Sequence, residues 1–207
     1  MAPPVSAPPR PSLQEETRSL LRNRVLDAVG ELLDERAWRD VTMAEVATRA
    51  GVSRQTLYNE FGARQELAEE YVMRETERFL AEVEVAVERS APDARLALES
   101  AFETFLLGAA RHPALQAVAS NSEGGEELLA LLTTRGGPVL VQATLRLAAA
   151  LAAHWPQLED ERTMQIAETL VRLAISHAAL ASAPPAATAR SVAEMLGPFV
   201  DEALADG

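Results

Sequence analysis

The sequence predicts an all-α protein, and three observations support this fold class. Alanine is abundant while aromatic residues make up only 4% of the 207 residues, a composition that favours packed helices. Apolar residues recur at helical spacing along much of the chain, and no segment shows a convincing strand pattern. Glycine and proline pairs interrupt this pattern at a few places, so we expect several separate helices.

The composition also limits the kinds of site that the chain can hold. Cysteine is absent, which excludes disulfide frameworks and thiolate metal sites. The net charge is −12, but it is distributed unevenly: residues 1–61 hold eight arginines against nine acids, and residues 62–207 hold eleven against twenty-two. The first part is therefore near neutral and has no strong basic stripe. A negatively charged partner would have to bind it through a few well-placed contacts, and salt would weaken that binding.

The N-terminal residues predict a tail followed by a helix. Residues 1–11 contain five prolines and no apolar run, which indicates a flexible tail and not a signal peptide. Ser12 and Glu15 have the spacing of a capping box, so the first helix is expected to begin there. Val25 and Leu32 belong to the apolar stripe of that helix.

Residues 42–61 form the most informative segment, because they predict a helix, a three-residue turn and a second short helix. Thr42 and Glu45 have capping-box spacing at the start of the first of these helices. Gly51 stands where the chain must turn sharply, a position that often needs positive φ. Ser53 is placed to cap the second helix.

The two short helices are expected to pack against each other and to leave one polar face exposed. The apolar residues at helical spacing are Val46, Ala47, Ala50, Leu57 and Phe61. The residues left to face outward are Arg54, Gln55, Thr56 and Tyr58. A short, firmly braced helix with such a face suits the major groove of DNA.

Further helices are expected over the rest of the chain, separated mostly by glycine or proline, and two of them are short. Their approximate ranges are 62–89, 92–111, 113–121, about ten residues after 125, 138–154, 159–182 and 187–205.

Residues 18–67 resemble the DNA-binding domain of the TetR (tetracycline-repressor-like) transcriptional regulators. The matching residues are Val25, Leu32, Val41, Thr42, Val46, Ala47, Ala50, Gly51, Val52, Ser53, Thr56, Leu57, Tyr58, Phe61, Arg64, Glu66 and Leu67. The resemblance implies a three-helix DNA-binding domain with a helix-turn-helix over residues 12–61. It also implies a helical ligand-binding and dimerisation domain over residues 62–207. Gln55, Asn59, Glu60 and Arg64 depart from the residues that the family often has at these places.

The resemblance also implies which side chains contact double-stranded DNA. The expected phosphate contacts are Thr42, Tyr58 and Arg64, and the expected base contacts are Arg54, Gln55 and Thr56, with Asn59 as a further candidate. Arg can pair bidentately with guanine, Gln with adenine, and the Thr methyl group can meet a thymine methyl group. The alternative roles are a helix cap for Thr42, packing within the domain for Tyr58, and ordinary surface positions for Arg54 and Asn59.

The middle helices are expected to enclose a cavity for a small-molecule effector. Its candidate lining residues are Phe79, Val83, Phe102, Phe105, Leu106, Asn121, Leu140, Gln142, Leu145, Leu170 and His177. Plain core is the ordinary alternative for any one of them, and a lone histidine on an apolar helix is more often a satisfied core residue. Because few charges lie in these segments, the effector is expected to be lipophilic, such as a fatty acid or an acyl thioester. No cofactor and no metal are expected.

The last two helices are expected to join two copies of the chain. Residues 164–181 are apolar nearly all round, and residues 192–203 carry an apolar face. The resemblance implies that this pair forms a homodimer interface, whereas the alternative is that it completes a monomeric core. A two-fold dimer would bind a near-palindromic operator, and repression relieved by the effector is the family default.

Other functional classes explain the sequence less well. His112, His154 and His177 are scattered, and the sequence lacks H-E-x-x-H, G-x-S-x-G and P-loop patterns, so we expect no enzyme. A helical module that binds only proteins would leave residues 54–58 without a role. No run of 18 apolar residues occurs, so no membrane span is expected, and the cytoplasm is the expected location.

Overall fold

The computed structural model describes residues 12–91, 93–111 and 137–205, and helices are the only regular elements in these ranges. The expected all-α class is therefore confirmed. The proline-rich tail, the short helices expected between 113 and 136, and Asn121 lie outside the described residues. The helices are α1 (Leu13–Glu35), the 3-10 helix η1 (Trp38–Asp40), α2 (Met43–Ala50), α3 (Arg54–Phe61), α4 (Arg64–Ser90), α5 (Ala94–Arg111), α8 (Gly137–His154), α9 (Asp160–Ala179) and α10 (Pro185–Ala205).

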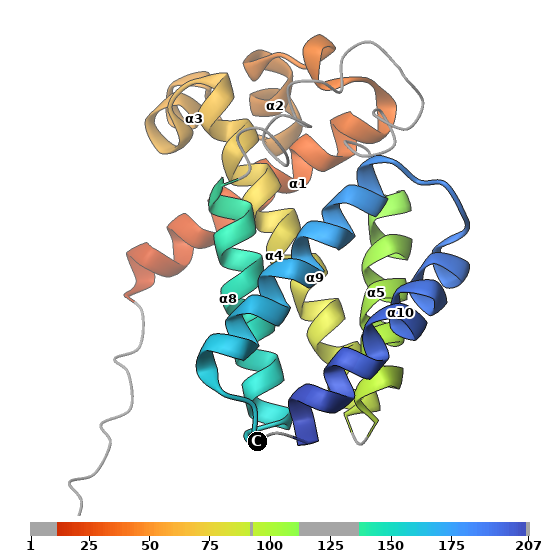
Figure 1. Cartoon of the computed structure of the whole chain (residues 1–207). Helices are drawn as coiled ribbons and strands as arrows, with labels where there is room; N and C mark the ends of the chain where they lie inside the picture. The colour runs from red at the N-terminus through yellow and green to blue at the C-terminus, as the bar shows by residue number, and fades with distance from the viewer. Residues whose placement is uncertain (1–11, 92, 112–136, 206–207) are drawn as a thin grey trace, which may run out of the picture.

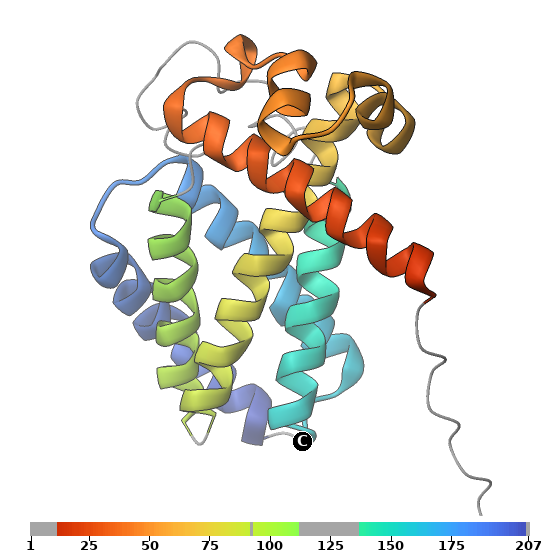
Figure 2. The ribbon, with the colours of Figure 1, turned by 180° about the vertical axis from the view of Figure 1, so that it is seen from behind.

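The first three α-helices form a small domain at one end of the molecule (Figure 1). Val29 of α1, Val46 of α2 and Leu57 of α3 are fully buried in its core. Ser12 accepts a hydrogen bond from the backbone of Glu15, so the expected capping box begins α1. The first turns of α1 extend past the rest of the domain (Figure 2), and residues 12–20 are exposed.

Helix α4 belongs to both parts of the molecule. Leu67 and Tyr71, near its start, are buried in the core of the N-terminal domain. Leu80 and Val87, near its end, are buried in the helical domain. One continuous helix of 27 residues therefore connects the two domains. The predicted boundary at residue 62 falls just before this helix.

The C-terminal domain is a bundle of helices in which α4 and α5 pack against each other (Figure 1). Helix α10 packs on α5, while α8 packs on α4 and on α9. The last helix begins at Pro185, where its fixed φ suits the first turn, and it continues through Pro198. No helix in the described ranges is both long enough and apolar enough to cross a membrane.

Candidate functional site

The turn between α2 and α3 depends on Gly51. Its φ of 67° lies in the left-handed region, which glycine adopts without strain. A Cβ atom here would lie 3.0 Å from Nη2 of Arg24, which donates a hydrogen bond of 2.7 Å to the carbonyl of Ala50. The backbone N–H of Val52 then donates to the carbonyl of Ala47 at 2.9 Å. The predicted helix-turn-helix is therefore present, and Arg24 fixes it to α1.

Thr42 caps α2 as predicted. Its hydroxyl oxygen accepts from the backbone N–H of Glu45 at 3.3 Å and donates to the Glu45 carboxylate at 2.7 Å. The backbone N–H of Thr42 donates to the same carboxylate at 2.9 Å. These hydrogen bonds from Thr42 lower the pKa of Glu45, and Arg36, 2.7 Å away, lowers it further. Thr42 is exposed beside this network, and its contact with phosphate stays a prediction.

Helix α3 has one buried side and one exposed side. Ser53 accepts a hydrogen bond of 3.0 Å from the backbone N–H of Thr56, which caps the helix. Leu57 and Phe61 are buried, and Thr56 is half-buried. The exposed side chains are those of Arg54, Gln55, Tyr58 and Asn59, so the structure brings these candidates together on one surface.

Two of the exposed residues of α3 are joined by a hydrogen bond. Nε2 of Gln55 donates to Oδ1 of Asn59 at 2.9 Å, across one turn of the helix. This bond leaves the Gln55 carbonyl oxygen and one N–H free to meet a base edge. Asn59 therefore positions the amide of Gln55, a role that the sequence pattern does not reveal.

Arg64 contacts the segment that precedes α2. Its guanidinium donates to the carbonyl oxygens of Val41, at 3.1 Å, and of Trp38, and its central carbon lies 4.4 Å from the centre of the Trp38 ring. The side chain is half-buried there. This position connects the start of α4 to η1, and the predicted phosphate contact stays a prediction.

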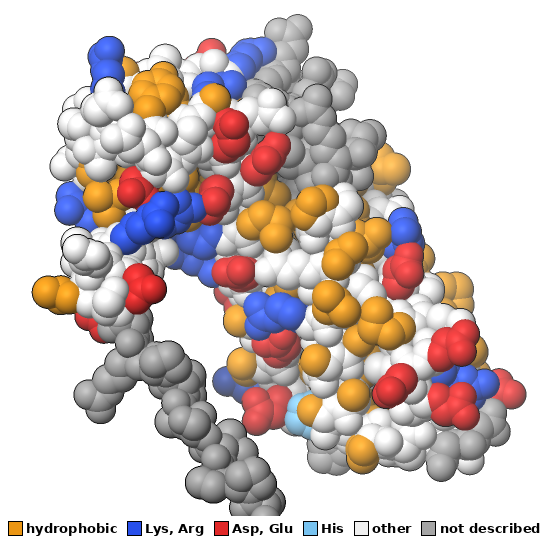
Figure 3. Space-filling model, turned by 90° about the vertical axis from the view of Figure 1, so that its left-hand side faces the viewer, with side chains coloured by type: hydrophobic (Ala, Val, Ile, Leu, Met, Phe, Trp, Pro, Cys, Tyr) orange, Lys and Arg blue, Asp and Glu red, His pale blue; other side chains and the backbone are white. Residues whose placement is uncertain are grey.

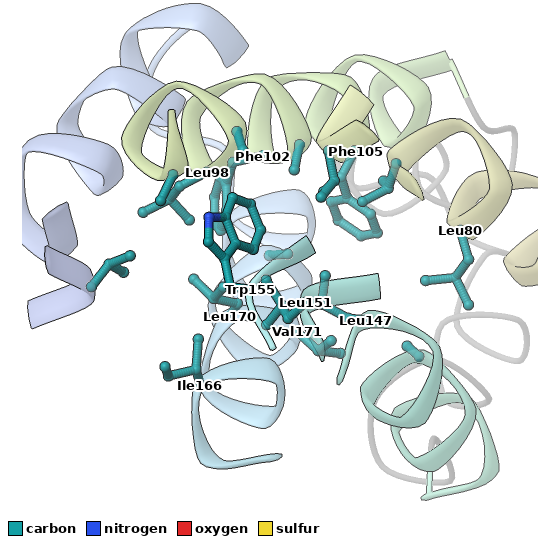
Figure 4. A pocket seen from close by; sticks show the side chains of 18 of the residues that line it. Leu80, Leu98, Phe102, Phe105, Leu147, Leu151, Trp155, Ile166, Leu170 and Val171 are labelled. Carbon is teal, nitrogen blue, oxygen red and sulfur yellow. The ribbon is translucent and has the colours of Figure 1, made fainter. Parts of the chain in front are cut away.

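An apolar cavity of about 90 Å³ lies among α4, α5, α8, α9 and α10. Of the predicted lining residues, Val83, Phe102, Phe105 and Leu170 do line it. Figure 4 labels the last three of them. Trp155, directly after α8, also lines the cavity and lies near Phe102. Sequence reasoning missed Trp155, because its only local signal is a position at the end of a helix.

The other predicted lining residues that the structure describes do not line this cavity. Leu145 is 55% exposed, because the cavity side of α8 is formed by Ala143 and Leu147. Leu106 is buried in a separate cluster with Val192 of α10.

Four further candidates lie around the cavity without lining it. Leu140 packs against a small hydrophobic cluster between α4, α8 and α9. Gln142 donates to Glu77 on α4 at 3.0 Å. The ring of His177 lies 6.0 Å from that of Phe102, behind the cavity wall. Phe79 lines two neighbouring hollows instead.

The described residues contain no group of three or more histidine, aspartate or glutamate side chains that is suited to a metal ion. In contrast, the polar face of α3 and the apolar cavity are both well defined. The polar side chains of α3 can form hydrogen bonds with a partner molecule, and the cavity can enclose an apolar molecule.

Comparisons with known proteins agree with this arrangement. Residues 25–71 match the profile described as bacterial regulatory proteins, tetR family, and residues 93–198 match that of the bacterial tetracyclin repressor, C-terminal domain. The HTH-type transcriptional regulator AlkX of Mycobacterium tuberculosis (strain ATCC 25618 / H37Rv) is 34% identical over 190 residues, which cover 90% of this chain and 88% of the relative.

Two solved structures are also similar. The TetR family repressor AlkX from Dietzia sp. strain DQ12-45-1b, described as implicated in biodegradation of n-alkanes, has a TM-score of 0.77 and 34% identity. The match covers 88% of this chain and 96% of that one. A candidate transcriptional regulator from Pseudomonas aeruginosa PAO1 has a TM-score of 0.51 and 15% identity over 92% of this chain and 93% of that one, and it supports the fold alone.

Proposed function

The chain belongs to the TetR family of transcriptional regulators, and from this premise we propose that it is a homodimeric repressor that a small lipophilic effector releases from its operator. The observation that carries the proposal is the position of α4, which contributes to both the DNA-binding core and the wall of the apolar cavity. We place the protein in the cytoplasm, where a bacterial transcriptional regulator would meet its DNA operator.

The proposed DNA contacts come from the exposed side of α3. Gln55 and Arg54 are placed at the start of the helix, where side chains of a recognition helix meet base edges. Tyr58, 50% exposed, is assigned to a phosphate oxygen through its hydroxyl group. In a two-fold dimer, two copies of α3 would lie about 34–36 Å apart and would read a near-palindromic operator.

The proposed dimer contact lies on the last two helices. Met164 of α9 and Met195 and Phe199 of α10 are exposed apolar side chains, which a partner would cover. A second candidate surface lies on α8, where Val141 and Leu145 are exposed. Hydrophobic side chains gather in a band on the face of the helical domain that contains α8 (Figure 3).

The proposed effector is lipophilic because all the described residues that line the cavity are apolar. The Dietzia relative, whose description connects it with n-alkane biodegradation, supports the same class of ligand. The cavity of about 90 Å³ is smaller than a typical ligand pocket of about 300–1,000 Å³, so a fatty acid or an acyl thioester would have to push the helices apart.

This movement of the helices explains how the effector would weaken DNA binding. Leu80, Val83 and Val87 place α4 in the cavity wall, so expansion of the cavity moves the helix that carries the DNA-binding core. An effector that binds the expanded state more tightly shifts the population away from the DNA-binding state. A coupling of about 1–3 kcal/mol would weaken operator binding roughly five- to 150-fold.

A gel-shift assay with the DNA upstream of the protein's own gene tests the proposal. We expect a salt-sensitive complex with this DNA and a loss of affinity when hexadecanoate is added. The control is Val83→Phe, which fills the cavity and should keep DNA binding while it removes the response to hexadecanoate. If the protein binds no duplex at low salt, the proposed function is wrong.

A further inference from the structure

Three hollows lie in series along α4. The apolar cavity described above shares Leu80, Phe105, Ala143 and Val171 with a second apolar cavity of about 60 Å³. The second cavity shares Glu75 and Phe79 with a polar cleft of about 530 Å³ between α1, α4 and α5. Four shared residues therefore separate the two apolar cavities, and two separate the second cavity from the cleft, so small side-chain rotations would join the hollows.

Phe79 forms the partition between the second cavity and the polar cleft. Its ring rests against the backbone of Gly108, where a Cβ atom would lie only 2.5 Å from the ring. The ring of Phe105 lies 6.4 Å from that of Phe79, on the side of the first cavity. Two aromatic rings therefore stand one after the other along the path from the cleft to Trp155.

The cleft differs chemically from the two cavities. Tyr71, Arg74, Arg78 and Arg111 supply hydrogen-bond donors, which favour a ligand atom that accepts hydrogen bonds. Five acids also line the cleft against the three arginines. This negative balance opposes a head group with several negative charges most strongly and an uncharged carbonyl group least, with a single carboxylate between the two.

We infer that the effector is an unbranched acyl chain whose hydrocarbon end lies at Trp155 and whose acyl oxygen lies in the cleft between α1, α4 and α5. The inference rests on the proposed function and adds the orientation of the ligand and a site for its head group. Glu75 and Val87, at the two ends of the path, lie twelve residues apart on α4, which is about 18 Å. An extended chain advances about 1.2 Å per bond, so this length suits a chain of about 15 carbon atoms.

The head-group site also lies where the two domains meet. Asp27 of α1 pairs with Arg74 at 2.7 Å and with Arg78 at 3.3 Å, and both arginines pair with Glu75. An acyl oxygen in the cleft would compete for donors that now connect α1 to α4. The head group thus weakens the contact between α1 and α4 directly, while the hydrocarbon chain moves α4 by pushing the helices of the bundle apart.

Quenching of tryptophan fluorescence tests the orientation, because the chain has two tryptophans and Trp155 lines the first cavity. The probes are hexadecanoic acid brominated on its terminal carbon and the same acid brominated beside its carboxyl group. We expect the terminal bromine to quench Trp155 at least fivefold more strongly than the other probe. Trp155→Phe should remove this difference, because it leaves Trp38 as the only tryptophan. Equal quenching by the two probes, or stronger quenching by the carboxyl-side bromine, overturns the inference.

Affinity measurements test the head-group site. Arg111→Gln should weaken the binding of hexadecanoate at least fivefold, whereas Arg89→Gln, on an exposed part of α4 outside the cleft, should leave it unchanged. Methyl hexadecanoate distinguishes the two head groups. If Arg111→Gln weakens the binding of both the acid and the ester, the site binds an acyl oxygen of either kind. If it weakens the binding of the acid alone, the site binds the free carboxylate. Equal affinity of Arg111→Gln and wild type for both probes overturns the site.

Ala143→Leu tests the shared wall between the two apolar cavities. It should weaken the binding of hexadecanoate while Ala81→Leu, on an exposed position of α4, does not. Operator binding is measured for every variant, as a check on folding. If hexadecanoate releases the operator but the bromine probes report the reverse orientation, the proposed function stands and this inference fails.

Discussion

The guanidinium of Arg64 lies over the ring of Trp38, 4.4 Å from its centre, and it donates to the carbonyl oxygens of Trp38 and Val41. Trp38 is almost completely buried in the core of the DNA-binding domain. Arg64 is the first residue of α4, so the contact joins the helix that leads to the cavity with the segment that leads into α2. A movement of α4 therefore reaches the helix-turn-helix through this side chain.

Arg64→Lys separates this bracing role from the predicted phosphate contact. Lysine keeps the charge but loses the planar fork that serves two carbonyls and stacks on an indole. We expect the free energy of unfolding to fall by about 1–3 kcal/mol, because hydrogen bonds to a charged group are lost. Chemical denaturation measures this change, and Arg89→Lys is the control. Unchanged stability together with weaker DNA binding would favour the phosphate contact instead.

Tyr58→Phe removes only the hydroxyl group that is assigned to a phosphate. Loss of one hydrogen bond of about 1 kcal/mol should weaken binding about fivefold for each subunit of the dimer, and equally for the operator and for an unrelated duplex. Because tyrosine is neutral, the dependence of affinity on salt should keep its slope, whereas loss of a charged phosphate contact lowers the slope by about one. Fluorescence anisotropy at several salt concentrations measures both quantities. A change of base preference in Tyr58→Phe would contradict the assignment.

Gln55→Ala should change the preferred base at one position of each half-site. A bidentate pair contributes about 1–3 kcal/mol of discrimination, so the preference should fall roughly five- to 150-fold. Asn59→Ala should reduce the same preference less, because Gln55 stays but loses the bond of 2.9 Å that orients its amide. Selection of binding sites from random duplexes measures the preference.

The control for this pair is Gln65→Ala. Gln65 is also exposed and donates to a residue one turn later, Glu69, at 3.0 Å, but it lies on α4. Its removal should leave the selected sequence unchanged. An unaltered selection with Gln55→Ala would remove Gln55 from the base-reading residues.

The parts of the fold that could be predicted from the sequence depend on short-range interactions. Thr42 and Glu45 are three residues apart, and Gly51 needs positive φ for a turn that its neighbours define, so local spacing was sufficient for both. Burial of Leu57 follows in the same way from helical periodicity.

The parts that could not be predicted depend on contacts between distant segments. Arg64 and Trp38 are 26 residues apart, and no local pattern indicates their contact. Leu145 and Leu147 are both apolar positions on one helix, yet only the packing of α8 on α4 and α9 decides which of them faces the cavity. The series of three hollows likewise arises from helices that are far apart in the sequence.

Thr42→Ala should make the protein less stable, and the difference should depend on pH. Loss of the cap costs about 1 kcal/mol at neutral pH. The hydrogen bonds from Thr42 lower the pKa of Glu45 in the folded state, so their stabilising effect is present above the ordinary carboxyl pKa. It is lost as the pH falls through the lowered pKa of the folded state, so the difference between the variant and the wild type should become smaller in acid, where only the cap bond from the Glu45 backbone N–H remains.

Thermal unfolding between neutral and acidic pH measures this change in the stability difference. Thr42→Ser, which keeps the hydroxyl group, should behave as the wild type does. Thr48→Ala is the matched control, because Thr48 is exposed on the same helix and its hydroxyl donates to the carbonyl of Ala44. If the stability difference for Thr42→Ala is the same at every pH, the stabilising effect of Thr42 does not depend on the ionisation of Glu45, and the prediction is wrong.

Phe199→Asp should convert the dimer to a monomer if the last two helices form the interface. Phe199 is 50% exposed on α10, and a buried, unpaired carboxylate in an interface is unfavourable enough to disrupt it. The matched variant is Leu145→Asp, at a position of α8 that is 55% exposed. Analytical ultracentrifugation gives the oligomeric state of each variant, and operator binding should fall with dimerisation because each half-site needs its own copy of α3. A monomer from Leu145→Asp and a dimer from Phe199→Asp would place the interface on α8 and reject the last two helices.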